Sequence, residues 1–316
     1  MYRYVIRRLF LMIPVVLGVS FIIFSILYFI PGDPASNILG VGATPEAVAQ
    51  LNEQLGFNKP FLVRYVNYIT DALFHGDFGN SYQNKLPVLG EIAKRVPISA
   101  TLSFGAIVVS LVIGVPLGVL SAYKQYSLWD KVPTGIALFI AATPAFIIGM
   151  LLMLIFSLRL GWLPVSGITY GWKSYILPVI SLGLPYGARQ LRFTRSSMLE
   201  TIRQDYVRTA KAKGASPRIV IWRHAMRNAL MPVITVAGTS FGAMLGGAIA
   251  IESLFGLPGL GTYIADGIKF KDVPAVTGGI IVYAVLFSLI ILLVDLSYAF
   301  VDPRIKAKYV EGGKAK

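Results

Sequence analysis

Few side chains in this sequence could take part in chemistry. The chain of 316 residues has no cysteine and only two histidines, His75 and His224, which lie far apart in the sequence. A thiolate nucleophile or thiolate metal site is therefore excluded, and a histidine-based metal or catalytic cluster is not expected. The sequence also has no GxxxxGKS or GxxxxGKT phosphate-binding loop. We predict no catalytic, cofactor-binding or metal-binding residue on this chain.

The most distinctive charged segment is a basic loop, which we define as residues 189–230. It contains ten lysines and arginines, although the whole chain is 55% hydrophobic and only 14% charged. Apolar residues at helical spacing predict a first short helix over about 197–213, ended by Gly214 in a left-handed conformation. A second helix is expected to begin with Ser216 as N-cap and Pro217 at the first helical position.

The sequence allows two interpretations of this basic loop, and a third, DNA binding, is excluded first. A helix-turn-helix can read DNA, but short connections to membrane spans would press a duplex against anionic lipid, so no nucleic-acid partner is expected. One remaining reading is a solvated loop whose charges only fix topology. The other, which we favour, is a docking element, because small residues expose backbone at the turn and let another protein approach. The candidate docking residues are Tyr206, Arg208, Thr209, Ala210, Lys211, Gly214, Ala215 and Ser216.

The composition indicates that the rest of the chain is a membrane protein, whose spans hold this loop in place. The mean hydropathy of +0.68 exceeds that of ordinary soluble domains, in which about half of the residues are apolar and about a quarter are charged. A helix of about 20 apolar residues is needed to cross a bilayer with all its backbone groups satisfied. We predict an all-α protein with six spans, at about 9–30, 98–123, 132–157, 175–188, 231–251 and 275–300.

Charge asymmetry orients these spans. With the N-terminus inside, twenty lysines and arginines fall on the cytoplasmic side and nine on the outer side, which places both termini in the cytoplasm. The first apolar run is longer than a signal-peptide core, so we expect it to stay as a span. The predicted organisation is a first span with a cytoplasmic N-terminus (1–30), an extracytoplasmic helical segment (31–97), a five-helix core (98–300) and a cytoplasmic tail (301–316).

The segment 31–97 carries helix start and stop signals of its own. Thr44 followed by Pro45 predicts a helix start, and Gly56 predicts its end. A second helix is expected over 61–74, ended by Gly76. These signals predict a small folded cap on the outer face.

The fifth predicted span has one helix face without side chains, formed by Gly238, Gly242 and Gly246 at four-residue spacing. Close packing between helices is the first interpretation of this spacing. A translocation path lined by backbone and small side chains is the second, with Glu252 just outside the span as a further pathway candidate. The other small-residue pairs, at 114–118 and 183–187, are expected to serve packing.

Asp295 is the one acidic residue that the sequence places within a predicted span. A carboxylate near the bilayer centre costs about 2.5–3.5 kcal/mol on insertion scales. A structural partner or capping role is the first interpretation, and a proton or ion relay is the alternative. A secondary transporter driven by an ion gradient would normally need several such groups, so one Asp argues against that class.

These stretches together resemble the membrane-spanning subunits of ATP-binding-cassette importers. In that family the cytoplasmic loop carries Glu-Ala-Ala, three residues and Gly, followed downstream by an apolar residue and Leu-Pro. The matching positions here are Arg208, Thr209, Ala210, Gly214, Met231 and Pro232, with Arg208 and Thr209 departing from the usual Glu and Ala. The dipeptide/oligopeptide/nickel permease branch has "YVRTAKAKG" as its ordinary form of the loop.

Other motifs strengthen the likeness to that branch, in particular to the first of its two paired permeases. They are "PGDPA", "GDFGNSYQNKLPV", "RHAMRNALMPVI", "LFGLPGLGTYIADGI" and "LLVDLSYAFVDPRIK", and they cover nearly the whole chain. The resemblance implies a type I importer permease fold in the inner membrane of a prokaryote. It also implies a non-catalytic subunit that forms half of an uptake path for dipeptides or oligopeptides, with nickel or oligosaccharides as alternative cargo.

The implied partners follow from the same resemblance. They are a second homologous permease, two cytoplasmic ATPases that hold ATP and Mg²⁺, an extracytoplasmic solute-binding protein, the peptide substrate and membrane lipids. In this family the first helix of the loop docks in a cleft of an ATPase, which would place Ala210 and Gly214 at the tight contact.

Overall fold

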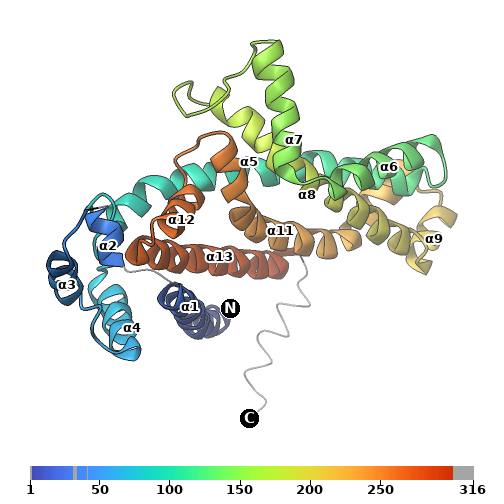
Figure 1. The fold of residues 1–316 in the computed structure, drawn as a ribbon. Helices are drawn as coiled ribbons and strands as arrows, with labels where there is room; N and C mark the ends of the chain where they lie inside the picture. Colours follow the sequence, from blue (N-terminus) through green and yellow to red (C-terminus); the bar gives the residue numbers. More distant parts are fainter. Residues whose placement is uncertain (1, 31–33, 41, 302–316) are drawn as a thin grey trace. The chain divides into compact units, whose positions relative to one another are not determined.

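The computed structural model describes residues 2–30, 34–40 and 42–301, and these residues are almost entirely helical (Figure 1). About 80% of the chain is helix, and the described part contains no strand, only an isolated bridge between Asn80 and Pro87. The expected all-α class is confirmed. The predicted tail, 301–316, lies outside the described residues except for Val301.

The chain forms two compact units. The first unit comprises 1–5, 100–257 and 289–316, and the second comprises 6–99 and 258–288. Three long helices, α1 (Tyr2–Phe29), α5 (Val88–Tyr123) and α13 (Val273–Val301), supply residues to both units.

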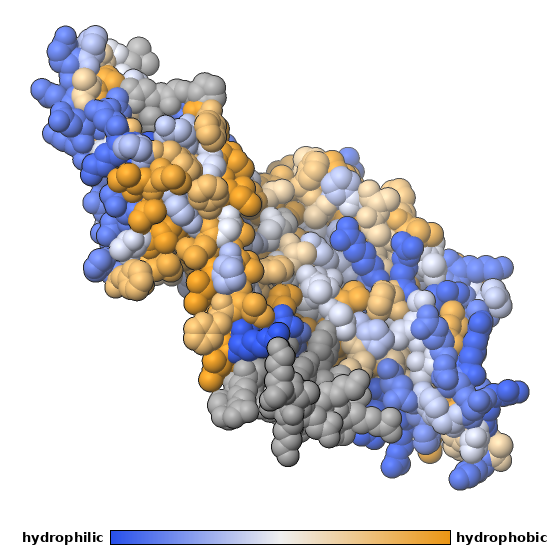
Figure 2. All heavy atoms as spheres, turned by 90° about the horizontal axis from the view of Figure 1, so that it is seen from below, coloured by the Kyte–Doolittle hydropathy of each residue, from blue (hydrophilic) through white to orange (hydrophobic). Residues whose placement is uncertain are grey.

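The second unit contains the first helix and the predicted cap. Its further elements are α1 (Tyr2–Phe29), α2 (Pro34–Leu39), α3 (Pro45–Gln54), α4 (Phe61–Thr70), the π-helical turn η1 (Asp71–His75) and α12 (Leu260–Lys269). Apolar side chains of α1, α4, α12 and the first part of α13 share one core, which includes Val16, Ile69, Ile264 and Val276. In the space-filling view, hydrophilic side chains gather over the end of this unit that carries α3 (Figure 2).

The local signals in the cap act as predicted. The Thr44 side chain accepts a hydrogen bond from the Ala47 N–H at 3.3 Å, and Pro45 takes the first helical position of α3. Gly56 and Gly76 adopt φ values of +69° and +66°, the left-handed region in which a residue without Cβ ends a helix without strain. Both predicted helix ends are confirmed.

The first unit contains the remaining helices. They are α6 (Leu128–Ala142), α7 (Ala145–Leu152), the π-helical η2 (Met153–Arg159), α8 (Lys173–Ile202), α9 (Asp205–Ala212), α10 (Pro217–Ile219), the π-helical η3 (Val220–Ala225) and α11 (Met226–Leu254). α8 lies between α6, α7 and α11, and half of its residues are buried.

The span predicted over 132–157 as a single helix is wrong in its continuity. The chain breaks between α6 and α7 and bends there by 103°. Thr143 is extended, with φ −89° and ψ 127°, because the ring of Pro144 disfavours helical geometry in the residue before it. The uniform hydropathy of the segment hides this break.

Four described helices are long and apolar enough to cross a membrane, or five if the bent pair of α6 and α7 counts as one. They are 5–29, 88–123, 217–246 and 273–296. α8 covers the predicted span 175–188 but does not reach this apolarity. Other helices surround much of α8, so its surface need not be apolar all round. A helix surrounded by lipid would have to be apolar on every side.

Glycines bring α5 and α8 into close contact. A Cβ on Gly114 would lie 2.6 Å from the carbonyl oxygen of Gly187, and one on Gly183 would lie 2.8 Å from that of Ala106. A Cβ on Gly118 would lie 2.6 Å from the Thr194 side chain. The packing role expected for these small-residue pairs is confirmed.

Candidate functional site

The basic loop begins where α8 ends, and its first helix is shorter than predicted. The helix expected over 197–213 is wrong in its extent, because α8 continues to Ile202 and α9 starts only at Asp205. Gln204 between them is extended, with φ −71° and ψ 148°. Met198 is fully buried against neighbouring helices, so tertiary packing keeps this part of the segment in α8.

Gly214 ends α9 through two backbone hydrogen bonds. The Gly214 N–H donates to the Lys211 carbonyl at 3.0 Å, and the Ala215 N–H donates to the Ala210 carbonyl at 3.2 Å. This pair of bonds is a Schellman motif, and the φ of +80° at Gly214 is the left-handed geometry it requires. A Cβ at this position would meet no atom within 4 Å, so only the backbone angle disfavours other residues.

The candidate docking residues gather on the accessible side of this turn. Tyr206, Arg208, Thr209, Lys211, Gly214 and Ser216 are exposed, and Ala210 and Ala215 are half-buried. Val207 is the one fully buried residue of α9. α9 therefore rests on the protein through Val207 and partly through Ala210, and presents most of its surface outward. In the space-filling view, hydrophilic side chains cover the end of the first unit that carries α9 (Figure 2).

The second half of the loop is continuous with the next long helix. Ser216 has the extended geometry of an N-cap residue, with ψ 150°, and Pro217 takes the first helical position, as predicted. The Ser216 hydroxyl makes no capping hydrogen bond. From Pro217 the chain continues through η3 directly into α11.

An apolar cluster holds this second half against α5 and α8. Its buried members are Val119, Ala122, Met198, Ile221, Ala225, Met226 and Ala229. Two side chains of α8 also bond to the backbone of α11: the Ser197 hydroxyl donates to the Ala229 carbonyl, and the Gln190 amide donates to the Val233 carbonyl at 3.2 Å. Close-packed interiors deform little, so this base can transmit a force applied at the turn.

An open apolar groove of about 510 Å³ adjoins the turn. It is lined by Pro116, Val119, Leu120, Tyr123, Ser216, Pro217, Arg218, Ile221 and Trp222. Trp222 keeps 54% of its surface exposed there. The groove lies between α5 and the second half of the basic loop, next to the turn that ends α9.

An ion pair that the sequence did not reveal fixes the helices beside the loop. The Arg195 guanidinium on α8 donates to both carboxylate oxygens of Asp130 on α6, at 2.6 and 2.8 Å. The helices extend beyond the predicted spans, so Glu91, Asp130 and Glu252 are also helical, outside the stretches predicted to cross the membrane. Asp130 and Arg195 are 65 positions apart in the sequence, so no local pattern links them.

The predicted pathway residues have different surroundings. A Cβ on Gly238 would lie 2.3 Å from the Val294 side chain on α13, so this glycine serves close packing, and it also borders an apolar groove of about 360 Å³. Gly242 is buried and Gly246 is exposed. Glu252 is fully buried at the end of α11, and Asp295 is half-buried on α13. The structure does not bring these residues together into one site.

Two family models match the chain along most of its length. Residues 114–307 match the model described as binding-protein-dependent transport system inner membrane component, and residues 1–104 match the model of the N-terminal part of such membrane components. The chain is 42% identical to the dipeptide transport system permease protein DppB of Alkalihalophilus pseudofirmus, over 97% of this chain and all of that one. It is 38% identical to the glutathione transport system permease protein GsiC of Escherichia coli K12, over 98% of this chain and all of that one.

Solved structures share the fold at low sequence identity. An inward-facing MetNI methionine ABC transporter matches with a TM-score of 0.57 and 17% identity, over 67% of this chain and 96% of that one. An amino acid ABC transporter crystallised with histidines matches with a TM-score of 0.54 and 14% identity, over 66% and 92% of the two chains. The helices of the present chain are therefore arranged as in the membrane chains of ABC importers.

Proposed function

Because the chain belongs to the binding-protein-dependent transport system inner membrane components, the permeases of ATP-binding-cassette importers, we propose that it forms half of an uptake path for short peptides. A second, homologous permease would form the other half. Two cytoplasmic ATPases would hold ATP and Mg²⁺, and an extracytoplasmic binding protein would deliver the peptide. The proposed role gives this chain no catalytic step of its own.

The observation that carries the coupling role is the presentation of α9. Most of its candidate contact residues are exposed, and the Schellman turn at Gly214 leads the chain through α10 and η3 into α11. An ATPase cleft that grips α9 would therefore pull on a helix that continues into the membrane. The short, small-residue turn lets the partner come close to the backbone.

The route of the force follows the packed contacts of the first unit. Displacement of the turn would pass through η3 to the apolar cluster around Met198 and Ala229, and from there to α5 and α8. Since α5 and α8 meet through glycines with no space for rearrangement, they would move as one body. Rigid-body rocking of two permease halves is a known way to expose a transport path alternately to each side.

Peptides are the proposed cargo because relatives that match over the full length are named for dipeptide and glutathione transport. A direct test measures ATP hydrolysis by the complete complex, reconstituted with its ATPases and binding protein, in the presence of a series of cargoes. Stimulation by the binding protein loaded with a di- or tripeptide is expected. Stimulation only by nickel or an oligosaccharide would contradict the proposed cargo.

Gly214→Asp tests the coupling role against a matched control. Gly161 also has a left-handed φ, +64°, and open space around its Cβ position, but it lies outside the basic loop. Both substitutions cost roughly 1 kcal/mol of backbone strain. We expect Gly214→Asp to insert normally and to lose peptide-stimulated ATP hydrolysis and uptake, whereas Gly161→Asp keeps both. Normal coupled uptake by Gly214→Asp would refute the docking assignment.

A further inference from the structure

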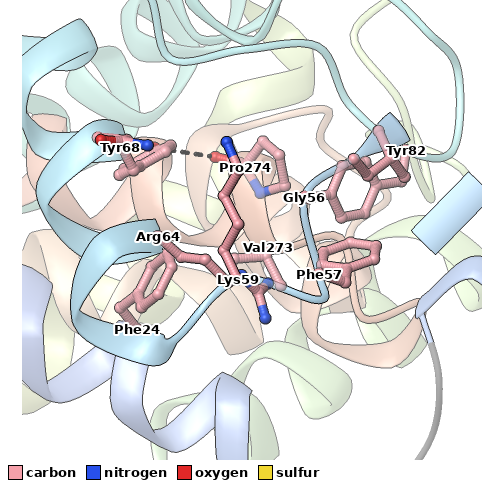
Figure 3. A pocket seen from close by; sticks show the side chains of 11 residues that line it. Phe24, Gly56, Phe57, Lys59, Arg64, Tyr68, Tyr82, Val273 and Pro274 are labelled. Atoms are coloured by element: carbon pink, nitrogen blue, oxygen red, sulfur yellow. Dashed lines mark hydrogen bonds between the residues drawn. The ribbon is translucent and has the colours of Figure 1, made fainter. Parts of the chain in front are cut away.

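The second unit contains a small pocket that the proposed transport role does not use. We name it the cap pocket. It has a volume of about 160 Å³ and is lined by Phe24, Leu55, Gly56, Phe57, Lys59, Arg64, Asn67, Tyr68, Tyr82, Val273 and Pro274 (Figure 3). Figure 3 shows Lys59 crossing the middle of this group, with Phe57 and Tyr82 on one side and Phe24 and Tyr68 on the other.

The lining of the cap pocket is cationic. Lys59 and Arg64 both border it, and none of its lining residues is acidic. Among the residues that the structure describes, no carboxylate forms an ion pair with Arg64. Asp272, which neighbours the pocket residue Val273, accepts hydrogen bonds from the Ser81 hydroxyl and from the Gln83 and Ala275 N–H groups.

Arg64 is held in place by aromatic rings while its donors stay available. Its guanidinium lies 4.6 Å from the centre of the Phe57 ring, 5.6 Å from that of Tyr28 and 6.0 Å from that of Phe24. Rings stack on the faces of the planar guanidinium, whereas its N–H groups point outward in the plane and can grip an anion with two bonds. Burial lowers the pKa of Arg64 from its ordinary value, so a bound anion would also stabilise its charge.

Two phenols add further hydrogen-bond donors. Burial raises the pKa of Tyr68 and of Tyr82 well above the ordinary value, so both remain protonated at neutral pH. The Tyr68 hydroxyl donates to the Pro274 carbonyl at 3.5 Å, a long and weak bond that a phosphate oxygen could replace. The Tyr82 ring packs edge-on against Phe57, with the ring centres 5.8 Å apart. The cap pocket is therefore rich in donors and has no anionic acceptor among its lining side chains.

The cap pocket lies beside the outer part of a membrane-spanning helix. α4 packs along α1: the Tyr65 hydroxyl donates to the Leu17 carbonyl at 3.0 Å, and the Phe61 ring lies 5.1 Å from that of Tyr28. Leu17 is twelve residues before the end of α1, which at about 1.5 Å per residue is roughly 18 Å along the helix. α4 thus runs beside the second half of α1.

Several exposed side chains of α4 and of the turn after it are apolar, although Asn67 and Thr70 are exposed as well. Leu62 and Val66 are 62% and 57% exposed, and Phe74 in the following turn is 81% exposed. Phe24, at the cap pocket, is five residues before the end of α1, about 7 to 8 Å along the helix. Since each headgroup region is roughly 5 to 8 Å thick, a cationic pocket this close to the end of a membrane-spanning helix is within reach of lipid phosphates.

We infer that the cap pocket binds a phosphate group, with Arg64 and Lys59 as its charged contacts. The group is either the headgroup phosphate of an anionic phospholipid in the outer leaflet or free phosphate. Phosphate matches the in-plane donors of arginine and the compact charge of lysine. This site is independent of the transport function proposed above, because it does not involve the basic loop or the cargo.

The test uses the full-length chain, purified in detergent and stripped of lipid. Dioleoyl-phosphatidylglycerol is titrated against dioleoylglycerol, which has the same acyl chains without phosphate, and binding is followed by native mass spectrometry. Retention of the phosphatidylglycerol alone is expected. Displacement by millimolar inorganic phosphate would identify free phosphate as the ligand, whereas its failure to displace would identify the lipid headgroup. Equal retention of both lipids would overturn the inference.

Two variants and a matched control complete the test. Arg64→Gln is expected to weaken binding by roughly tenfold or more, because it removes a charge-assisted pair of bonds. Lys59 is exposed and outside the core, so Lys59→Gln keeps the inference testable even if Arg64→Gln fails to fold. Arg189, stacked on Tyr186 at 5.3 Å in the first unit, is the control, and Arg189→Gln should bind as the wild type does. Unchanged binding in both cap-pocket variants would overturn the inference.

Discussion

The ion pair between Asp130 and Arg195 joins α6 to α8 and provides a quantitative test of the structure. The guanidinium makes two parallel bonds to the carboxylate, at 2.6 and 2.8 Å. The Asp130 side chain is 5% exposed and that of Arg195 is 25% exposed. The Tyr126 N–H also donates to the carboxylate, at 2.9 Å, and supports its position at the start of α6.

The expected energies follow from this partial burial. Removing one partner of a fully buried pair costs about 3–5 kcal/mol, because the other charge is left without compensation. Arg195→Gln leaves the nearly buried carboxylate behind, so we expect it to lower the free energy of unfolding by about 3 kcal/mol. Asp130→Asn leaves a guanidinium that water can still reach, and we expect about 2 kcal/mol. The double variant should lose about 3 kcal/mol rather than the sum, which gives a coupling energy of about 2 kcal/mol.

The assay is a double-mutant cycle on the purified full-length chain. Unfolding in detergent is followed by the intrinsic fluorescence of tryptophan as denaturant is added, for the wild type, both single variants and the double variant. Arg192 lies on the same helix but is exposed, so Arg192→Gln should change the unfolding free energy by less than about 0.5 kcal/mol. A coupling energy below about 0.5 kcal/mol would refute the assignment of this pair as the contact that fixes α6 against α8.

Two further predictions concern glycine contacts. Gly114→Ala should lower the free energy of unfolding by about 1–3 kcal/mol in a thermal scan, because its Cβ would meet the Gly187 backbone oxygen. Gly135→Ala is the control: its Cβ would meet no atom within 4 Å, so it should be neutral or stabilising in the same scan. Gly238→Ala should destabilise by a similar amount, and adding Val294→Ala should recover part of the loss in a denaturation series. Equal effects of the first two substitutions, or no recovery in the second case, would contradict the close packing described here.

Short sequence signals predicted correctly where several helices begin and end. Thr44 and Pro45 start α3, and Gly56 and Gly214 end helices, because caps and left-handed turns depend on a few adjacent residues. The extent of α8 was predicted wrongly for the opposite reason. Met198 packs against other helices in the part of α8 that extends about four turns beyond the apolar segment, and nothing near it in the sequence signals this.

Hydropathy also hid the break in the third predicted span. Pro144 was a local signal for the break, but the apolar residues on both sides have the composition of one continuous helix. Hydropathy measures how a segment interacts with its solvent, whereas the residue before a proline is restricted by its own sterics. The bend of 103° between α6 and α7 therefore follows from a backbone constraint that average composition does not contain.

The candidate sites differ in how far the sequence could reveal them. The exposed side of α9 was predictable because its residues are consecutive, although its docking role remains a proposal. The cap pocket was not predictable, since Phe24, Arg64 and Pro274 come from three distant segments. Only Arg64, among the aromatic residues of α4, gave a local signal, and a single arginine in a short helix is by itself uninformative.

The contacts of α8 explain why a force applied at the loop could act on the whole first unit. The Arg195 ion pair ties α8 to α6, the Gln190 amide ties it to α11, and Gly183 brings it against α5. Each contact is directional or sterically tight, so none can slide without loss of a bond or a clash. A displacement of η3 cannot be absorbed locally by these helices. The same rigidity that makes single substitutions in α8 costly is therefore what the proposed coupling to an external ATPase requires.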